Sequence, residues 1–576
     1  MTSDQSDITA DTVLYGGKVI TVDRHFSIAE AVAVKNDRII GVGRNSEIKK
    51  LAGEKTETVD LDGKVVVPGF IDGHAHMDRE GLKCQYPSLD GKRSVRDILK
   101  TVEKEVKRKK PGEWVVTMPI GDYPHYYDTE GPDYLTDGRF PNRWDLDRIS
   151  PDNPVYIRGI WYYWRKTFPI VSIGNSYALK LAGINRNTVP PYEGIEILRE
   201  EESGEPTGVF LEWDQPDTVE FSLMEVLPRF THEDRVKGLK KSMEMYNAVG
   251  TTSVYEGHGI SSETLRAFKT LWEAGDMSVR SYLVLSPAWD AVPGAEIEEV
   301  LRDWATYASG VGFGDHMLKL GGIWTSVGCP PTDQIRRKER PYTGWAGYGV
   351  DQSLPPERGS LYDLILAAVR TDLRVNGIAA APAILNQYLD VLARVDQQIP
   401  IMARRFVLQH LSYVGESQLN EVKRLGIVPT MIPSSSMWMW GSDDTKDADQ
   451  EKLNTYFPFK DFAKRGVPFV LCTDNNPIDP LHVYWVTVSR KDRKTGSVIA
   501  PGQKISREET LRALTINGAY LTFEEGIKGS IEVNKLADLA VLSDDLLTCP
   551  EEKIRDIEVL LTMVGGQIVH REEEYV

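Results

Sequence analysis

Cysteine is scarce in this sequence, which has only four in 576 residues. They are Cys84, Cys329, Cys472 and Cys549, far apart and without a CxxC pair. Such spacing argues against a disulfide framework and fits a reducing compartment. The polar, acidic N-terminal segment does not resemble a signal peptide, and the sequence lacks an apolar run long enough to span a membrane. We therefore expect a soluble, cytoplasmic protein.

Positive charge is also in short supply. The chain has 68 lysines and arginines against 85 aspartates and glutamates, which gives a formal net charge of -17. Such a charge disfavours nucleic acid and anionic membranes, so we expect neither as a partner. Hydrophobic residues make up 41% of the chain, which at this length allows a large core and more than one domain.

Short apolar segments separated by turn residues occur at both ends of the chain. Residues 12–62 contain hairpin patterns that turn at Gly16-Gly17 and Asn36-Asp37. Residues 536–569 contain similar short strands and turn at Gly565-Gly566. The economical interpretation is that both termini build one small β-sandwich domain, into which the middle of the chain is inserted.

The middle of the chain alternates apolar strands with amphipathic helices. This alternation, over roughly 450 residues, predicts an α/β fold with a (β/α)8 TIM-like barrel. The interval around 80–245 is too long for one βα unit, so we expect an insertion there, near the barrel mouth. The predicted organisation is therefore 1–68 and 521–576 for the β-sandwich and 69–520 for the barrel.

One stretch ends an apolar run with two histidines, in the order Val65-Val66-Val67-Pro68-Gly69-Phe70-Ile71-Asp72-Gly73-His74-Ala75-His76. The run is typical of a buried strand, and Pro68-Gly69 predicts a change of direction within it. Residues i and i+2 of an extended chain point to the same side, so the two imidazoles can chelate a divalent cation such as zinc. The alternative is a surface pair of histidines at a strand end.

Three further ligand-type residues accompany predicted strands. Lys319 lies inside an apolar strand, whereas His410 and Asp474 each end one. Barrel enzymes place their sites at the carboxyl ends of the strands, and a lysine in an apolar strand is costly unless it is paired or modified. Each residue also has an ordinary interpretation, as a lysine at the barrel rim, a satisfied core histidine and a helix N-cap aspartate.

Together these motifs resemble the amidohydrolase superfamily of metal-dependent hydrolases, and within it the branch typified by N-substituted formamide deformylase. The resemblance extends over nearly the whole chain. Its further motifs are Gly174-Asn175-Ser176-Tyr177-Ala178-Leu179, Ser203-Gly204-Glu205-Pro206-Thr207-Gly208, Thr515-Ile516-Asn517-Gly518-Ala519-Tyr520 and Lys535-Leu536-Ala537-Asp538-Leu539-Ala540-Val541-Leu542.

The resemblance implies a metal site and a role for each ligand. His74 and His76 would bind the more buried metal, His410 would bind a second one, and a carboxylated Lys319 would bridge the two. Asp474 would bind the first metal and act as general base towards a metal-activated water. Zinc is the expected metal, with manganese or iron as alternatives.

The sequence departs from the family pattern at the fifth strand, where Asn376 stands in place of a histidine. An amide oxygen is a weaker ligand for zinc than an imidazole, so both one and two metal ions stay open. After the third strand, Glu256 and His258 alternate onto one face. His258 could replace the lost ligand, or one metal could suffice while His258 contacts substrate or the developing oxyanion. We favour one metal with a catalytic His258.

Aromatic loops supply the candidates for substrate contacts. Trp438 and Trp440 follow the seventh predicted strand, and Arg165 contributes a cation from a second aromatic loop. With Glu256 and Asn376 they form the predicted substrate-binding set. These loops indicate a small-molecule substrate that is cyclic or aromatic and carries a polar handle. We also expect a homodimer.

These features predict a metal-dependent amidohydrolase that cleaves a C–N bond of an amide or cyclic amide. A rival on the same scaffold is a hydrolase that opens a C–C bond of a cyclic 1,3-diketone, a reaction of the dihydrophloroglucinol cyclohydrolase type. A rival of another class is a non-catalytic binding protein that has lost its metal. Asn376 favours that last alternative, and the five retained family positions argue against it.

Overall fold

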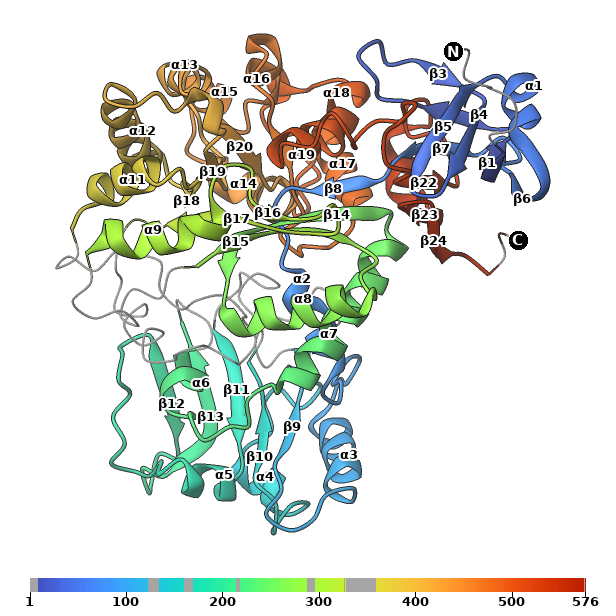
Figure 1. Cartoon of the computed structure of the whole chain (residues 1–576). Coiled ribbons are helices and arrows are strands. Elements are labelled where there is room, and N and C mark those ends of the chain that lie inside the picture. Colours follow the sequence, from blue (N-terminus) through green and yellow to red (C-terminus); the bar gives the residue numbers. More distant parts are fainter. Residues whose placement is uncertain are drawn as a thin grey trace.

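An eight-stranded parallel sheet, curled into a nearly closed barrel, forms the centre of the molecule (Figure 1). The computed structural model describes residues 9–122, 134–159, 169–213, 218–286, 296–325, 327, 359–573 and 575. The barrel strands, in order, are β8 (Phe70–Asp72), β14 (Thr251–Ile260), β15 (Arg280–Leu285), β17 (Leu318–Thr325), β18 (Val375–Ile378), β19 (Val407–Gln409), β20 (Val428–Met431) and β21 (Val470–Leu471). The predicted α/β barrel is confirmed.

Amphipathic helices cover the outside of the barrel, as the strand–helix alternation predicted. Among them are α8 (Ser262–Ala274), α9 (Ile297–Ala308), α11 (Leu361–Arg370), α12 (Pro382–Asp396), α13 (Glu416–Arg424) and α16 (Phe459–Arg465). Local sequence sets their ends: the Ser261 side chain accepts a hydrogen bond from Thr264 N at the start of α8, and Gly275 ends that helix with φ 72°. Inside the barrel Tyr255 stacks on Tyr282, with ring centroids 5.1 Å apart, so the interior is packed and is not a pore.

The two ends of the chain share one small β-sandwich. One sheet contains β1 (Ala10–Tyr15), β4 (Ala31–Lys35), β5 (Arg38–Gly43) and β6 (Ala52–Asp60). The other contains β2 (Lys18–Ile20), β3 (Ile28–Ala29), β7 (Val65–Pro68), β22 (Leu539–Leu542), β23 (Val559–Val564) and β24 (Gln567–Arg571). Val66 of β7 lies opposite Val541 of β22, which joins the two termini in one ladder. The predicted sandwich built from both termini is therefore confirmed.

Pro68-Gly69 carries the chain from the sandwich into the barrel. Residues up to Pro68 belong to β7, whereas Phe70 starts β8. A Cβ atom on Gly69 would lie 2.2 Å from Thr252 Cγ2 of the neighbouring barrel strand, so only glycine fits this crossing. The change of direction that the dipeptide predicts is a change of domain.

A fourth sheet is inserted in the chain between barrel strands β8 and β14. It comprises β12 (Ile195–Arg199), β13 (Pro206–Glu212), β11 (Ile170–Gly174), β10 (Val155–Ile157) and β9 (Val115–Thr117), in that order. These strands lie in the interval where the sequence predicts an insertion, and Figure 1 places them below the barrel. The chain returns to the barrel through α7 (His232–Ala248).

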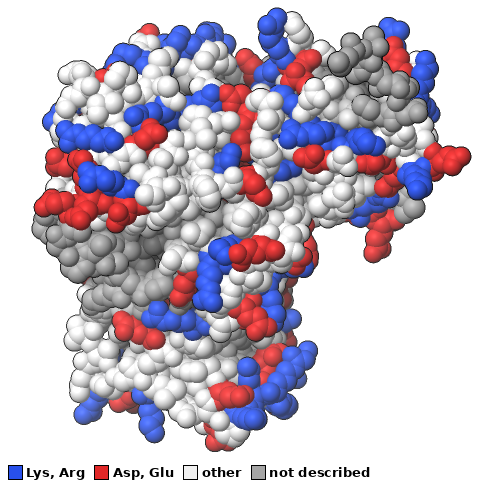
Figure 2. Space-filling model, in the orientation of Figure 1, with Lys and Arg blue, Asp and Glu red and all other residues white. Residues whose placement is uncertain are grey.

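Acidic and basic side chains are intermingled on the face shown in Figure 2. Among the described residues of that face no broad basic area is visible. Within the described part of the chain, no helix combines the length and the apolar character needed to cross a bilayer.

Candidate active site and metal centre

His74 and His76 follow β8 at the carboxyl end of the barrel. Their side chains are 0% and 2% exposed, and the ring centroids lie 5.0 Å apart. Asp72 fixes the turn, because its Oδ1 accepts hydrogen bonds from His74 N at 3.1 Å and from Thr473 N at 3.1 Å. The last residue of the first barrel strand thus holds His74 beside the end of the eighth strand.

His410 and Asp474 approach the same point from β19 and β21. His76 Nε2 lies 2.8 Å from Asp474 Oδ1, and His74 Nε2 lies 3.5 Å from the same oxygen. His410 Nε2 lies 3.3 Å from His74 Nε2. Both His410 and Asp474 have positive φ, at 61° and 51°, a strained conformation that is often found at functional sites.

His258, from the long central strand β14, completes a ring of imidazoles. Its centroid lies 4.7 Å from that of His74, 4.9 Å from that of His76 and 5.7 Å from that of His410. Trp324, from β17, packs against the other side of His258 at 5.2 Å. The structure therefore brings together five predicted site residues: His74, His76, His258, His410 and Asp474.

The chemistry of this cluster fits a divalent cation. Burial lowers the pKa of His74 to about 3 and that of His76 well below its ordinary value, so both rings are neutral, the form that binds metal. Burial raises the pKa of Asp474 to about 7, a shift that a nearby cation would reverse. Three overlapping groups have ligand atoms close enough to hold a metal: His74, His76 and His258; His74, His410 and Asp474; and His76, Asp78 and Glu256. Imidazole and carboxylate are typical zinc ligands.

Lys319 lies away from this cluster, which corrects the prediction of a carboxylated bridging ligand. It is the second residue of β17, and the strand continues to Thr325 before it reaches the carboxyl end of the barrel. Lys319 Nζ forms an ion pair with Glu524 Oε1 at 2.9 Å. This ion pair offsets the cost of a lysine in an apolar strand.

Asn376 and Glu256 do not line the cavity, so their predicted role in substrate binding is also corrected. Asn376 lies inside the barrel, where its Oδ1 accepts a hydrogen bond from the Tyr255 hydroxyl and its Nδ2 donates to Ile323 O at 3.1 Å. Glu256 lies behind His76, where its Oε1 accepts from Met77 N at 2.7 Å. Both residues therefore form hydrogen bonds to neighbouring groups of the protein and lie outside the cavity wall.

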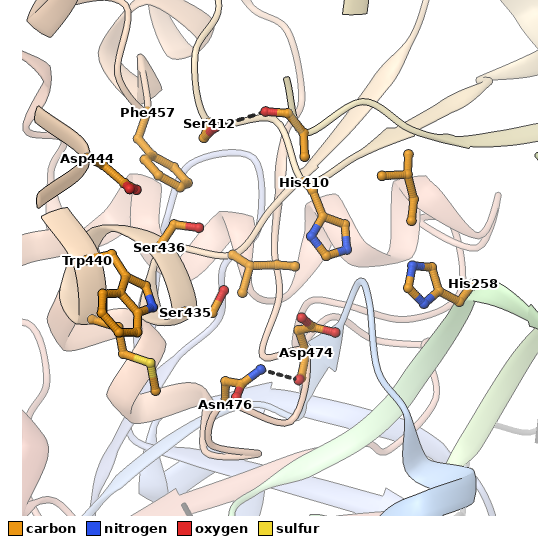
Figure 3. Close-up of a pocket in the computed structure, with 14 residues that line it drawn as sticks. His258, His410, Ser412, Ser435, Ser436, Trp440, Asp444, Phe457, Asp474 and Asn476 are labelled. Carbon is orange, nitrogen blue, oxygen red and sulfur yellow. Dashed lines mark hydrogen bonds between the residues drawn. The ribbon is translucent and has the colours of Figure 1, made fainter. Parts of the chain in front are cut away.

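A cavity of about 340 Å³ opens directly onto the cluster (Figure 3). Its wall consists of His258, Ile378, Ala380, His410, Ser412, Ile432, Ser435, Ser436, Met439, Trp440, Asp444, Phe457, Asp474 and Asn476. Figure 3 shows Trp440 on the wall opposite His258, with Asp474 between them. A substrate in this cavity would contact His258, His410 and Asp474, whereas His74 and His76 lie deeper.

Of the two tryptophans predicted to contact substrate, one lies on the cavity wall and the other does not. Trp440 lines the cavity, but the ring of Trp438 packs on His482 instead, with centroids 4.6 Å apart. Arg165 lies outside the described residues. Sequence reasoning missed Phe457 and Asp444, which no motif marks, and Asn476, whose position next to the Asp474 motif was an available signal.

Comparison with known proteins agrees with this geometry. The amidohydrolase family profile matches residues 57–570, most of the chain. The chain belongs to the amidohydrolase family. It is 26% identical to the N-substituted formamide deformylase of Arthrobacter pascens, over 96% of this chain and 97% of that protein. It is likewise 26% identical to the protein LONG AFTER FAR-RED 3 of Arabidopsis thaliana, over 97% of this chain and 91% of that protein.

Solved amidohydrolase-like structures share the fold. An uncharacterised metal-dependent hydrolase from Pyrococcus horikoshii superposes with a TM-score of 0.65 at 22% identity, over 94% of this chain and 99% of that one. One from Pyrococcus furiosus gives a TM-score of 0.66 at 20% identity, over 93% and 100%. These structures share the fold of this chain, and the family match confirms the predicted resemblance.

Proposed function

We propose that this amidohydrolase-family protein cleaves a C–N bond of an amide or cyclic amide with a water molecule activated at the five-residue cluster. The observation that carries the proposal is the convergence of two imidazoles on one carboxylate oxygen: His74 Nε2 and His76 Nε2 lie 3.5 Å and 2.8 Å from Asp474 Oδ1, beside a substrate-sized cavity. The Arthrobacter relative, named for deformylation of N-substituted formamides, supports this choice of bond.

His74, His76 and Asp474 would hold the cation, and His410 is close enough to complete the set. We favour one ion, and zinc over manganese or iron, because imidazoles dominate the donors and Lys319, the predicted bridging ligand, is engaged elsewhere. Bound there, the ion would lower the pKa of a water molecule and polarise the substrate carbonyl.

The chain's own residues would handle the protons and the developing charge. Asp474 lines the cavity, and beside a bound cation it would be an ionised carboxylate that can take a proton from the attacking water and return it to the leaving nitrogen. His258 lies beside it on the same wall, where a ring N–H could donate a hydrogen bond to the carbonyl oxygen as negative charge develops. Asp474 would serve as general base and His258 as stabiliser of the oxyanion.

The cavity favours a compact substrate with a ring and a polar group. Trp440 and Phe457 offer aromatic faces, and Met439 with Ile432 adds apolar surface. Ser412, Ser435 and Ser436 bring hydroxyl groups that can donate or accept hydrogen bonds. A neutral cyclic amide with hydrogen-bonding substituents matches these walls.

Metal analysis of the purified protein, combined with hydrolysis assays, tests the proposal. We expect about one zinc equivalent per chain, loss of activity on chelation, and the formation of an amine and an acid from open-chain amides or of a ring-opened amino acid from lactams. Asp474→Asn should bind metal less tightly and lose turnover. Ring opening of cyclic 1,3-diketones without turnover of any amide would contradict the C–N assignment, and a chain that binds no metal would point to a binding protein.

A further inference from the structure

The barrel is joined differently between its first and last strands than elsewhere. Each described barrel strand forms a parallel ladder with its sequence-order neighbour, but among the described residues no ladder joins β21 to β8. The residues that follow these two strands make the connection instead, starting with Asp474 N, which donates to His74 O at 3.0 Å. This seam carries three of the proposed metal ligands.

The Asn475 side chain forms the second part of the seam. Its Oδ1 accepts hydrogen bonds from His76 N at 3.0 Å and from the Tyr246 hydroxyl at 2.6 Å. Its Nδ2 donates to His76 O at 2.9 Å and to Glu80 Oε2 at 2.9 Å. One amide therefore uses all its donors and acceptors and holds both main-chain polar groups of a metal-binding residue.

The surroundings fix which way this amide points. His76 N–H can only donate and His76 C=O can only accept, so the two ends of the amide cannot exchange. Glu80 is itself buried and paired with Lys83, whose Nζ lies 2.6 Å from Glu80 Oε1. Asn475 is only 5% exposed, so these hydrogen bonds are shielded from water and losing them leaves buried polar groups unsatisfied.

We infer that Asn475 is a positioning residue of the metal centre, which sets the distance between His76 and Asp474. The inference rests on the metal site proposed above. Asn475 directly follows Asp474 in the chain, so a side chain clamped to the His76 backbone ties the two ligands together across the seam. Their contact, 2.8 Å from His76 Nε2 to Asp474 Oδ1, is the shortest among the proposed ligands. A loosened clamp would separate the ligands and weaken the cation's binding.

Asn175 offers a matched control. It is also fully buried and also forms four hydrogen bonds: its Oδ1 accepts from Val155 N at 3.0 Å and Ala178 N at 2.9 Å, and its Nδ2 donates to Ser150 O at 3.2 Å and Asn153 O at 2.9 Å. It follows β11 of the inserted sheet directly, as the N-cap of α5 (Ser176–Leu181), away from the metal centre. Replacement of either amide by a carboxylate sets an oxygen against two acceptors. These are two carbonyl groups at Asn175, but a carbonyl group and the Glu80 carboxylate at Asn475, so a second variant without a new charge is also needed.

The experiment titrates the metal-stripped full chain with Co²⁺ and records the visible absorption spectrum. We expect Asn475→Asp to raise the Kd for Co²⁺ by about tenfold to a hundredfold and to change the spectrum. Asn175→Asp should leave both unchanged, although each variant loses thermal stability. Tyr246→Phe removes one hydrogen bond without a new charge and should raise the Kd by about threefold.

Two results would overturn the inference. One is a folded Asn475→Asp variant that binds Co²⁺ with the wild-type Kd and spectrum; if that variant does not fold, Tyr246→Phe with a wild-type Kd decides against it equally. The other is a wild-type chain that binds no Co²⁺, which would also overturn the proposed function. If the wild-type chain binds Co²⁺ and the variants bind it equally well, the positioning role of Asn475 is wrong but the proposed function stands.

Discussion

The two ends of the barrel bury polar groups in opposite ways. At the carboxyl end, the Asp474 carboxylate faces the imidazoles of His74 and His76. At the amino end, the Glu524 carboxylate is flanked by two ammonium groups, Lys319 at 2.9 Å and Lys528 at 2.7 Å. Both carboxylates are buried, and β14 passes both, with Ser253 near Lys528 and His258 near the metal centre.

The pKa values of Asp474 and Glu524 differ accordingly. Burial raises the pKa of Asp474 to about 7. Burial acts in the same direction on Glu524, but Lys528 and Lys319 outweigh it and lower that pKa to about 2. At the amino end the carboxylate is already paired with two lysines, and this pairing stabilises the fold. At the carboxyl end the carboxylate faces imidazoles, and together these groups can bind an added cation.

The largest effect should come from His76→Ala, which removes a ligand and leaves the amino end untouched. We expect loss of bound metal and of activity by more than about ten-thousandfold, with a folded chain. Metal content, turnover and the unfolding midpoint together measure this. His232→Ala, outside the cluster, is the control. If His76→Ala kept the wild-type metal content, His76 would not be a metal ligand, and the proposed metal-binding role of the carboxyl end would be contradicted.

Glu524→Gln should have the complementary effect, a loss of stability without loss of metal. It leaves the buried Lys528 ammonium without its carboxylate, which should lower the free energy of unfolding by about 3 kcal/mol. Denaturant unfolding measures the difference. Glu525→Gln is the adjacent control: its partner Arg405 lies 2.7 Å away in a more exposed ion pair, so the cost should stay below about 1 kcal/mol.

The stability difference between the wild-type protein and Glu524→Gln should depend on pH. A carboxyl group whose pKa is lowered by folding contributes stability above its unfolded pKa of 4.5 and loses it as the pH falls towards the folded value of about 2. The difference should therefore be constant from pH 7 to pH 5 and shrink below pH 4.5. A difference that grows on acidification would show that Glu524 is not held as an anion.

The sequence predicted the carboxyl end well because its signals are local. His74 and His76 follow an apolar strand, and His410 and Asp474 each end one, so strand position alone places all four at one edge. Lys319 was misplaced because a lysine within an apolar strand does not reveal how far the strand continues. Its partner Glu524 lies more than two hundred residues away in the chain, with a sequence separation of 205, and no local pattern connects them.

The fold was also predictable from local sequence signals, whereas the residues of the cavity wall were not. Strand–helix alternation and terminal hairpins are periodic patterns that predict a barrel and a sandwich. Trp438 and Trp440 belong to one aromatic segment, yet only Trp440 lines the cavity. The segment is helical, and side chains two positions apart in a helix point to different faces. Phe457 comes from a later loop, which only tertiary packing brings to the cavity.

His258→Ala should have an intermediate effect and test whether β14 contributes chemistry or a metal ligand at its carboxyl end. Under the one-ion proposal we expect turnover to fall by about a hundredfold to a thousandfold, with unchanged metal content. Steady-state kinetics and metal analysis of the same preparation separate the two roles. Loss of about one metal equivalent would make His258 a ligand and would favour a second ion.

The smallest effect should come from Lys319→Met, which keeps the length of the side chain and removes its charge. Glu524 retains Lys528, and the side chain of Lys319 is 15% exposed, so the free energy of unfolding should fall by only about 1–2 kcal/mol. Metal content and turnover should be those of the wild type, because Lys319 belongs to the charged amino end. Loss of activity that a short carboxylic acid restores would instead show a carboxylated lysine at the metal. Lys319 would then act at the carboxyl end of the barrel and not at the amino end.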